Sequence, residues 1–340
     1  MPEAFLELPN DPIELAQEAA HRSIGDGLPI VAPTEERLAR MIEAASVDPD
    51  HILGWMPPAY GEITARYIAI NAIMAGCCPD HMPLLIAVAK ALLEPKFNLY
   101  GIQMTTAPTA PLVVVHGPIA KRLGVNAKEG AFGPGVYANA VIGRAVRLML
   151  MNLGGGIPGQ TDRSTHGQPA KFTFCVAENE DETPWDPFYV RQGLTLGTDA
   201  VTVFGIQSQH NIIDFTATDG FEVLQLLASA MAMVGTNNIT HGGEALVVIP
   251  PQHALQLKNS NIDYETATQF VYERARLDIT KFPEGLQKVI KARRPAWIDL
   301  SDCPVTDRYQ DIQFLVVGGA GIHAQFLPSF GATRAVTVPI

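Results

Sequence analysis

Four short apolar runs rich in β-branched residues constrain the fold of this 340-residue chain more than any other feature. They are residues 112–115, 201–204, 246–249 and 315–317, and each precedes a turn rich in Gly, Pro or Gln. An uninterrupted apolar run of this length is typical of a strand buried on both faces. Segments with helix caps and helical periodicity lie elsewhere in the chain, as after Asp11. The pattern predicts an α/β protein with mixed or parallel sheets covered by helices.

Histidines follow these runs in the sequence: His116, His210, His253 and His323. Ligands of such sheets bind beyond the carboxyl ends of the strands, so these side chains lie where chemistry is expected.

Two segments form a weak internal repeat. Residues 112–123 and 246–257 share the order strand, turn, helix, and each follows an apolar, Ala-rich helical stretch. The repeat predicts two lobes related by a pseudo-twofold axis. The expected divisions are an arm of helices and a strand (28–31) over residues 1–60, a first α/β lobe over 61–180 and a second over 181–340.

The stretch 132–179 concentrates polar residues between apolar segments. Its predicted helix, 137–153, carries Arg144 and Arg147 three residues apart and therefore on one face. A guanidinium on a mostly buried helix needs a carboxylate, a phosphate or backbone carbonyls as partner. The two arginines either pair with internal carboxylates such as Glu178 or Asp162, or clamp an anionic substrate in bidentate fashion.

Further candidates surround this helix in the sequence. His166 and Glu178 are candidate acid or base residues. Lys171, which opens a predicted strand over 171–177, and His116 are candidates for binding the substrate. A later basic run, 281–294, is expected to be a solvated helix face.

Two adjacent cysteines lie between two predicted helices. Cys77 and Cys78 follow the helix that ends at Gly76, and Pro79 opens the next one, with His81 one turn inside it. The positive end of a helix dipole favours a thiolate at this position. The two thiols are either small buried hydrophobes, catalytic groups, or metal ligands together with His81. The other cysteines, Cys175 and Cys303, complete no C-x-x-C motif, so a disulfide framework or structural zinc finger is not expected.

Composition excludes several classes of protein. A formal net charge of −11 argues against general nucleic-acid binding, and 47% hydrophobic residues are enough for a sizeable core. No run of about eighteen apolar residues and no signal peptide is recognised, so a cytoplasmic protein without membrane association is expected.

Two glycine-rich segments fit the pattern G-x-G-x-x-A, residues 133–138 and 319–324. The first lacks a preceding strand, and the second lacks an acidic residue about twenty positions on. A conventional NAD site or P-loop nucleotide site is therefore not expected. The sequence does not identify a cofactor, and a transition metal is the candidate.

Several short motifs carry a resemblance to a known group of proteins. They lie at residues 26–34, 75–79, 143–147, 166–171, 177–180 and 330–334. In these motifs the chain resembles an uncharacterised bacterial family, similar to proteins found with, or fused to, small proteins that bear a Cys-Gly-Ser-Cys or selenocysteine-Gly-Ser-Cys (UGSC) motif. The resemblance implies a component of a two-protein enzyme, because that motif is absent from this chain.

Taken together, these features predict an enzyme or enzyme subunit of the lyase, hydratase or hydrolase type. Cys/His chemistry would act on a small, polar, anionic substrate. We expect a homo-oligomer or a complex with a second small protein. Two alternatives are a thiol redox component, with Cys77 and Cys78 relaying to a separate selenol or thiol protein, and a partner subunit without catalysis. The enzyme hypothesis requires the thiols, the arginines and the strand-end histidines to surround one cavity.

Overall fold

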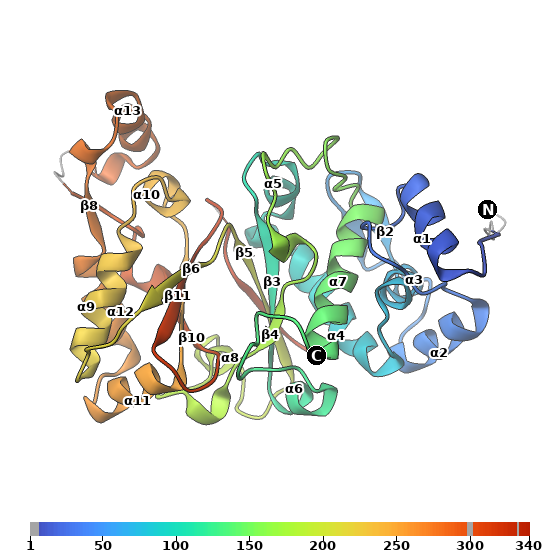
Figure 1. The fold of residues 1–340 in the computed structure, drawn as a ribbon, viewed down its shortest axis with the longest axis horizontal. Helices are drawn as coiled ribbons and strands as arrows, with labels where there is room; N and C mark the ends of the chain where they lie inside the picture. Colours follow the sequence, from blue (N-terminus) through green and yellow to red (C-terminus); the bar gives the residue numbers. More distant parts are fainter. Residues whose placement is uncertain (1–6, 298–301, 332) are drawn as a thin grey trace.

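The computed structural model describes residues 7–297, 302–331 and 333–340 (Figure 1). The first six residues of the predicted arm lie outside this range. The longer helices are α1 (Pro12–His21), α2 (Glu35–Ala45), α3 (Ala65–Ala75), α4 (Met82–Leu93), α7 (Tyr137–Asn152), α9 (Gly220–Met231), α11 (Pro251–Asn259), α12 (Tyr264–Arg274) and α13 (Glu284–Arg293). The shorter ones are α5 (Leu99–Met104), α6 (Pro118–Leu123), α8 (Phe188–Arg191) and α10 (Asn237–His241).

Two four-stranded sheets form the centre of the molecule. The first has the order β12 (Val336–Pro339), β5 (Ala200–Ile206), β3 (Ala110–His116), β4 (Cys175–Ala177). The second has the order β6 (His210–Ile213), β11 (His323–Pro328), β7 (Ala245–Ile249), β10 (Ile312–Val316). Two small antiparallel pairs, β1 (Gly54–Met56) with β2 (Gly61–Ile63) and β8 (Arg276–Asp278) with β9 (Asp302–Pro304), stand apart. Three of the apolar runs lie in strands and the fourth, 315–317, extends one residue beyond β10. The predicted α/β class with mixed sheets is confirmed.

The strand pairings of the two sheets correspond. In each sheet one inner strand, β3 or β7, pairs in parallel with β4 or β10 and antiparallel with β5 or β11. An antiparallel edge strand, β12 or β6, completes the order. The segments of the predicted repeat, β3 with α6 and β7 with α11, therefore occupy equivalent places in the two sheets.

The sheets pack face to face, with helices on the two outer sides (Figure 1). Val113 and Val115 of β3 pack in one core cluster with α3, α4 and α7. The alternate residues Leu112 and Val114 share a different cluster with Leu246 of the second sheet, because successive side chains of a strand point to opposite faces. The second sheet packs its other face against α9, α11 and α12. The strands β3, β5, β7 and β10 are thus buried on both faces, which explains their uninterrupted apolar runs.

The predicted division at residue 180 does not separate the two sheets. Both β5 and β12 lie within 181–340, yet they pair in the first sheet. The chain crosses to the second sheet between β5 and β6 and returns between β11 and β12. The first sheet therefore takes strands from both predicted lobes, whereas all four strands of the second sheet lie within 181–340. Strand pairing depends on contacts between residues that are distant in the sequence.

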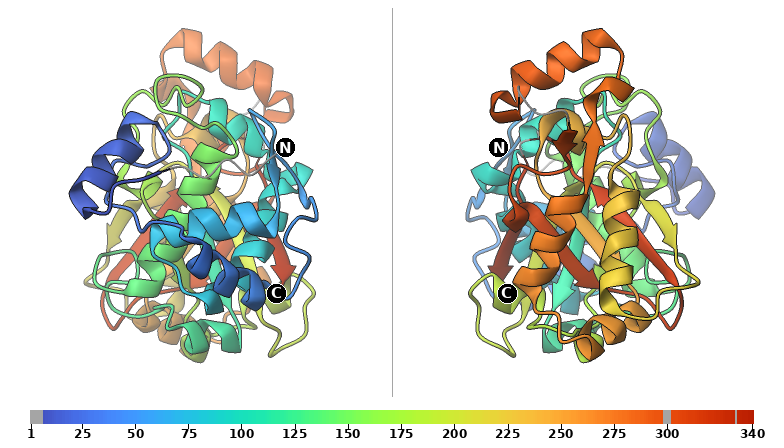
Figure 2. Two further views of the ribbon diagram at one scale, coloured as in Figure 1. Left: turned by 90° about the vertical axis from the view of Figure 1, so that its right-hand side faces the viewer. Right: turned by 90° about the vertical axis from the view of Figure 1, so that its left-hand side faces the viewer.

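The N-terminal arm packs on the outer side of the first helical layer (Figure 2, left). Its helices begin as expected: Asp11 Oδ1 accepts the backbone N–H groups of Ile13 and Glu14, and Thr34 caps α2. The strand expected at 28–31 was wrong, since this segment has no strand pairing in the described part of the chain. The strand expected at 171–177 is confined to its last three residues.

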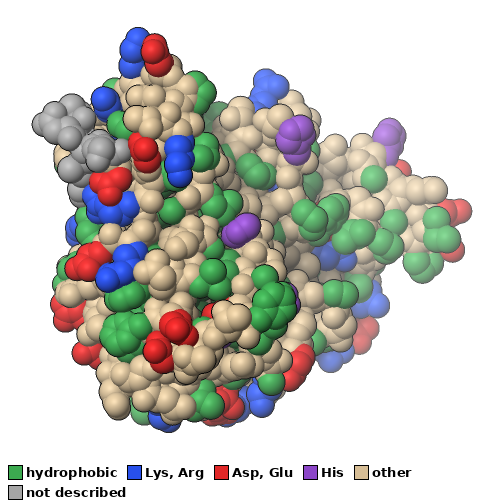
Figure 3. Space-filling model, turned by 60° about the vertical axis from the view of Figure 1, so that its left-hand side comes forward, with side chains coloured by type: hydrophobic (Ala, Val, Ile, Leu, Met, Phe, Trp, Pro, Cys, Tyr) green, Lys and Arg blue, Asp and Glu red, His purple; other side chains and the backbone are tan. Residues whose placement is uncertain are grey.

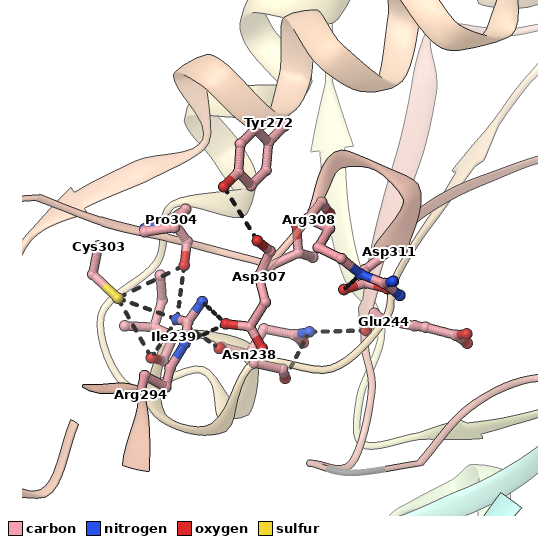
Figure 4. A network of polar contacts seen from close by, with 12 residues as sticks. Asn238, Ile239, Glu244, Tyr272, Arg294, Cys303, Pro304, Asp307, Arg308 and Asp311 are labelled. Carbon is pink, nitrogen blue, oxygen red and sulfur yellow. Dashed lines mark hydrogen bonds and ion pairs between the residues drawn. The ribbon is translucent and has the colours of Figure 1, made fainter. Parts of the chain in front are cut away.

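Arg294, at the end of the basic run, is buried rather than solvated. Its guanidinium donates to Asp307 Oδ1 at 2.7 and 2.9 Å and to the backbone carbonyls of Ile239 and Pro304 (Figure 4). It also donates to Cys303 Sγ at 3.1 Å. The expectation of a solvated face was wrong at this position. Arg294 follows the last residue of α13, and this end of the helix packs against α10, so the side chain is buried.

Charged side chains of both signs are interspersed over the face that includes the second sheet's helices (Figure 3). Within the described ranges, no helix combines the length and apolar character that crossing a membrane requires.

Candidate functional site

A cavity of about 220 Å³ lies between α2 and the turn that joins α3 to α4. Its walls include Arg37 and Arg40 of α2 on one side and Cys77, Cys78 and Pro79 of the turn on the other. The turn forms here because Gly76 ends α3 at a φ of +95°, a value that favours glycine. A 3-10 turn (Pro79–His81) then leads directly into α4.

Cys78 and His81 face each other across the start of this helical segment. Cys78 Sγ lies 3.5 Å from His81 Nδ1 and 3.8 Å from Nε2. The backbone N–H of Cys78 also donates to Nδ1, at 3.1 Å. Burial lowers the pKa of His81, an effect that the charge of Asp80 only partly offsets. The imidazole is therefore neutral near pH 7, with its proton on Nε2, and its Nδ1 lone pair faces Cys78.

Cys77 is in a different environment from its neighbour. Its thiol donates to the backbone carbonyl of Val141 on α7, at 3.3 Å. Burial raises the pKa of this thiol strongly, and the nearby Cys78 and Cys175 add to the effect. A thiolate is the reactive form of cysteine, so Cys77 is held in its unreactive form. Of the adjacent pair, only Cys78 has the setting of a reactive group.

Arg144 and Arg147 do not reach the cavity, because both are paired inside the fold. Arg144 forms a bidentate ion pair with Asp26, at 2.7 and 2.8 Å, and also donates to the carbonyl of Leu28. Arg147 lies 3.1 Å from Asp162 Oδ2. These contacts agree with the alternative in which the two arginines pair with internal carboxylates. Asp162, the partner of Arg147, was one of the carboxylates that the sequence suggested, whereas Asp26, the partner of Arg144, was not.

Lys171 shares the carboxylate of Asp162 with Arg147, at 2.6 Å. Burial works to raise the pKa of Asp162, but Lys171, the Ser164 N–H group and Arg147 outweigh it and the pKa is lowered. The same burial lowers the pKa of Lys171. Beside this triad there is a gap of only about 10 Å³, about enough for one water. A substrate therefore has no space next to Lys171 in this arrangement.

His116 and Glu178 form a buried pair at the ends of β3 and β4. His116 Nδ1 lies 2.9 Å from Glu178 Oε2, and its Nε2 lies 2.9 Å from Thr202 Oγ1. Both side chains are inaccessible to solvent. Glu178 also accepts the backbone N–H of Phe188. Strand ends do gather polar groups here, as expected, but at a different cavity from the thiols.

The remaining predicted site residues lie elsewhere. His166 is exposed on the loop after α7, apart from both cavities. Within the described ranges, no group of three or more His, Cys, Asp and Glu side chains is arranged to hold a metal ion. Cys77, Cys78 and His81 therefore form no such group. The predicted residues do not surround a single cavity.

Sequence reasoning missed the two arginines that line the thiol cavity. Arg37 and Arg40 are three residues apart, the same spacing that drew attention to Arg144 and Arg147. They lie beside the apolar stripe of an exposed helix, where arginines are common and do not by themselves indicate a binding site. The capping signal at Thr34 located the helix, but only the packing of α2 against the turn before α4 placed the arginines near a thiol.

No protein-family model matches this chain, and a comparison with curated proteins found no significant match.

Proposed function

We propose that this protein is an enzyme or enzyme subunit in which Cys78 and His81 act on a small anionic substrate held by Arg37 and Arg40. The observation that carries the proposal is the position of Cys78, a partly accessible thiol 3.5 Å from a neutral imidazole on the wall of a cavity. A nucleophile with an adjacent base is the usual arrangement for covalent catalysis. The fitting reaction classes are lyase, hydratase and hydrolase.

The charges around the cavity support an anionic substrate. Arg37 and Arg40 are exposed side chains on the cavity wall, and Arg37 donates one N–H to the carbonyl of Ala32. Its other donors, and those of Arg40, face solvent. Guanidinium groups bind carboxylates and phosphates through paired N–H donors, which gives geometric selection as well as charge. A cavity of about 220 Å³ suits a small molecule.

The proposed first step is the transfer of the Cys78 thiol proton to His81 Nδ1. The transfer replaces the backbone hydrogen bond at Nδ1 by a thiolate–imidazolium ion pair. The thiolate then adds to an electrophilic carbon of the substrate. The imidazolium returns its proton to the group that takes up the displaced electron pair, so that proton and charge balance.

Alkylation rates test this site without knowledge of the substrate. We expect iodoacetamide to modify Cys78 before Cys77, Cys175 and Cys303, as mapped by peptide mass spectrometry. We further expect the anionic reagent iodoacetate to react severalfold faster at Cys78, relative to iodoacetamide, than it does with free cysteine, because two guanidinium groups attract it.

Matched variants separate the parts of the proposal. Arg37→Gln with Arg40→Gln should remove the preference for iodoacetate, whereas Arg163→Gln, on an exposed loop outside the cavity, should keep it. His81→Asn should slow alkylation and move its pH profile upward. Reaction of Cys78 at the rate of free cysteine, with no preference between the reagents, would rule out the proposed site.

The alternative of a partner subunit without catalysis has one observation in its favour. It expects the central polar residues to form closed ion-pair networks, and Arg144, Arg147 and Lys171 do so. The redox alternative requires both adjacent thiols. The Cys77 thiol donates a hydrogen bond to the Val141 carbonyl, and its burial raises the pKa of this thiol. Cys77 therefore disfavours the thiolate form that a relay needs.

A further inference from the structure

Another cavity, of about 610 Å³, lies between the end of β6 and one side of α9. Part of its wall comes from the loop 214–219, which joins these two elements. Four further lining residues recur at intervals of three or four and so share one face of α9: Glu222, Gln225, Leu226 and Ser229. None of the lining residues belongs to the thiol cavity.

The position of Asp214 is one where α/β sheets bind ligands. Asp214 directly follows β6, which runs in the same direction as β7 because both strands pair antiparallel with β11. The helix α11 begins two residues after the end of β7. Asp214 and the start of α11, with His253, therefore lie at the carboxyl edge of the second sheet.

The carboxylate of Asp214 lacks a partner. Asp214 lines the cavity and is only 7% exposed. Its Oδ1 accepts the backbone N–H groups of Thr216 and Ala217, both at 2.9 Å, but its Oδ2 has no hydrogen-bond partner among the described residues. Buried charged oxygens are nearly always bonded, because leaving one without a donor is costly. The unpaired oxygen indicates a missing donor.

The neighbouring side chains of α11 do not supply a positive charge. Gln256 donates its Nε2 to the carbonyl of Ala217 at 2.6 Å, and its Oε1 is itself unpaired. His253, one turn earlier on the same face, has an unpaired Nδ1. Burial lowers the pKa of His253, and the charge of Asp214 only partly offsets this, so the imidazole is neutral near pH 7. A cation for Asp214 therefore has to come from the cavity.

Two more carboxylates line the cavity at the start of α9. Asp219 Oδ1 accepts the backbone N–H groups of Phe221 and Glu222 and so caps the helix. Glu222 Oε2 accepts the N–H and the hydroxyl of Thr218. Each carboxylate uses one oxygen in these bonds, which leaves the other oxygen for a ligand. The described wall includes no Lys, Arg or His, so its negative charge is not balanced from within the cavity.

We propose that this cavity binds an aliphatic diamine in its doubly protonated form, with one ammonium group on Asp214 and the other on Asp219 and Glu222. Three carboxylates without a cationic neighbour favour a ligand with two positive charges. Phe221 and Leu226 also line the cavity and would contact the methylene groups. The lining face of α9 spans two turns, about 10 Å, which suits an elongated molecule.

Calorimetric titration of the full chain with putrescine, near pH 7.5 and at low ionic strength, tests the proposal. We expect putrescine to bind. The monoamine n-butylammonium has the same carbon chain and one charge, and it should bind at least about tenfold more weakly, the loss of one charge-assisted hydrogen bond. Magnesium chloride at the same ionic strength should also bind more weakly, because a metal ion makes no use of the apolar wall. Tighter binding of magnesium than of putrescine would show a site for inorganic cations and overturn the proposal.

Matched variants locate the binding. Asp214→Asn keeps the size of the side chain and an oxygen for the two backbone N–H groups, and it should weaken putrescine binding at least about tenfold. Asp219→Asn retains a residue suited to capping α9 and should weaken binding severalfold. Glu284→Gln removes one negative charge from an exposed position outside the cavity and should leave the affinity unchanged.

Circular dichroism checks that each variant is folded. The proposal is wrong if putrescine does not bind, if n-butylammonium binds equally well, or if Asp214→Asn and Asp219→Asn both keep the natural affinity. Because Cys78→Ser should not alter this titration, its result is separate from that of the thiol site.

Discussion

Two ion pairs with a buried carboxylate join side chains that are distant in the sequence. Arg144 reaches Asp26 across 118 residues, and Arg334 reaches Asp311, at 3.0 Å, across 23. Removing one side chain of a buried ion pair lowers the free energy of unfolding by more than the pair itself contributes, because the other charge is left buried without a partner. The sequence indicated that the arginines need partners, but it could not identify them.

Glu244 differs from these paired groups, because its hydrogen bond and the nearby charges do not fully offset the effect of burial on its pKa. Burial raises its pKa to about 6, although the Ala335 N–H, at 2.7 Å, and Arg334 oppose the effect. The folded protein therefore holds this proton more tightly than the unfolded chain does. The stability from this group is fully present below the unfolded pKa of 4.5 and is lost as the pH rises through about 6.

We predict that Glu244→Gln abolishes this contribution. Between about pH 4 and about pH 7.5 the free energy of unfolding of the natural protein should fall by roughly 2 kcal/mol more than that of the variant. Urea unfolding at a series of pH values measures the difference. Glu273→Gln, an exposed carboxylate, is the control and should show the natural pH dependence. Identical pH profiles for Glu244→Gln and the natural protein would contradict the prediction.

At the scale of elements, helix ends decide the geometry of the thiol site. Gly76 closes α3 with a positive φ and so turns the chain toward Cys78 and α4. A Cβ at this position would meet only Val141 Cγ1, at an ordinary 3.6 Å. The demand for glycine is therefore conformational rather than steric.

Gly76→Ala should consequently destabilise the protein by about 1–2 kcal/mol, the cost of a side chain in the left-handed region. It should also change the alkylation rate of Cys78, because the turn carries that thiol. Gly285→Ala is the matched control: Gly285 lies in α13 without a positive φ and with open space around it. That change should stabilise by roughly 0.5–1 kcal/mol. Chemical unfolding gives both values, and an unchanged stability for Gly76→Ala would refute the argument.

At the scale of the whole molecule, the chain crosses between the two sheets twice, and the sheets share a core. Chain segments cross between the sheets after β5 and after β11, and Leu112 and Leu246 lie in one common cluster. Neither sheet can unfold without exposing apolar surface of the other. We therefore expect the two halves to unfold as one cooperative unit.

Phe326→Ala tests this cooperativity. Phe326 is fully buried in the second sheet, and its truncation should cost about 3–5 kcal/mol. Calorimetry should show a single transition at a lower temperature, with near-UV and far-UV circular dichroism changing together. A first transition that leaves the first sheet folded would show that the halves are independent.

The sequence alone determined the local structure of this protein, because caps and apolar periodicity act over a few residues. It placed α1, α2 and α7 closely and located the strands β3, β5, β7 and β10. It failed at 28–31, where Pro29 offers no N–H and no strand among the described residues pairs with the segment.

Only the tertiary structure decided which groups meet. It paired Arg144 and Arg147 internally, brought Arg37 and Arg40 to the cavity of Cys78, and separated that cavity from the strand ends at Glu178. It also joined β12 to β5 across more than a hundred residues. These arrangements depend on packing and strand pairing between distant segments, which no local pattern in the chain encodes.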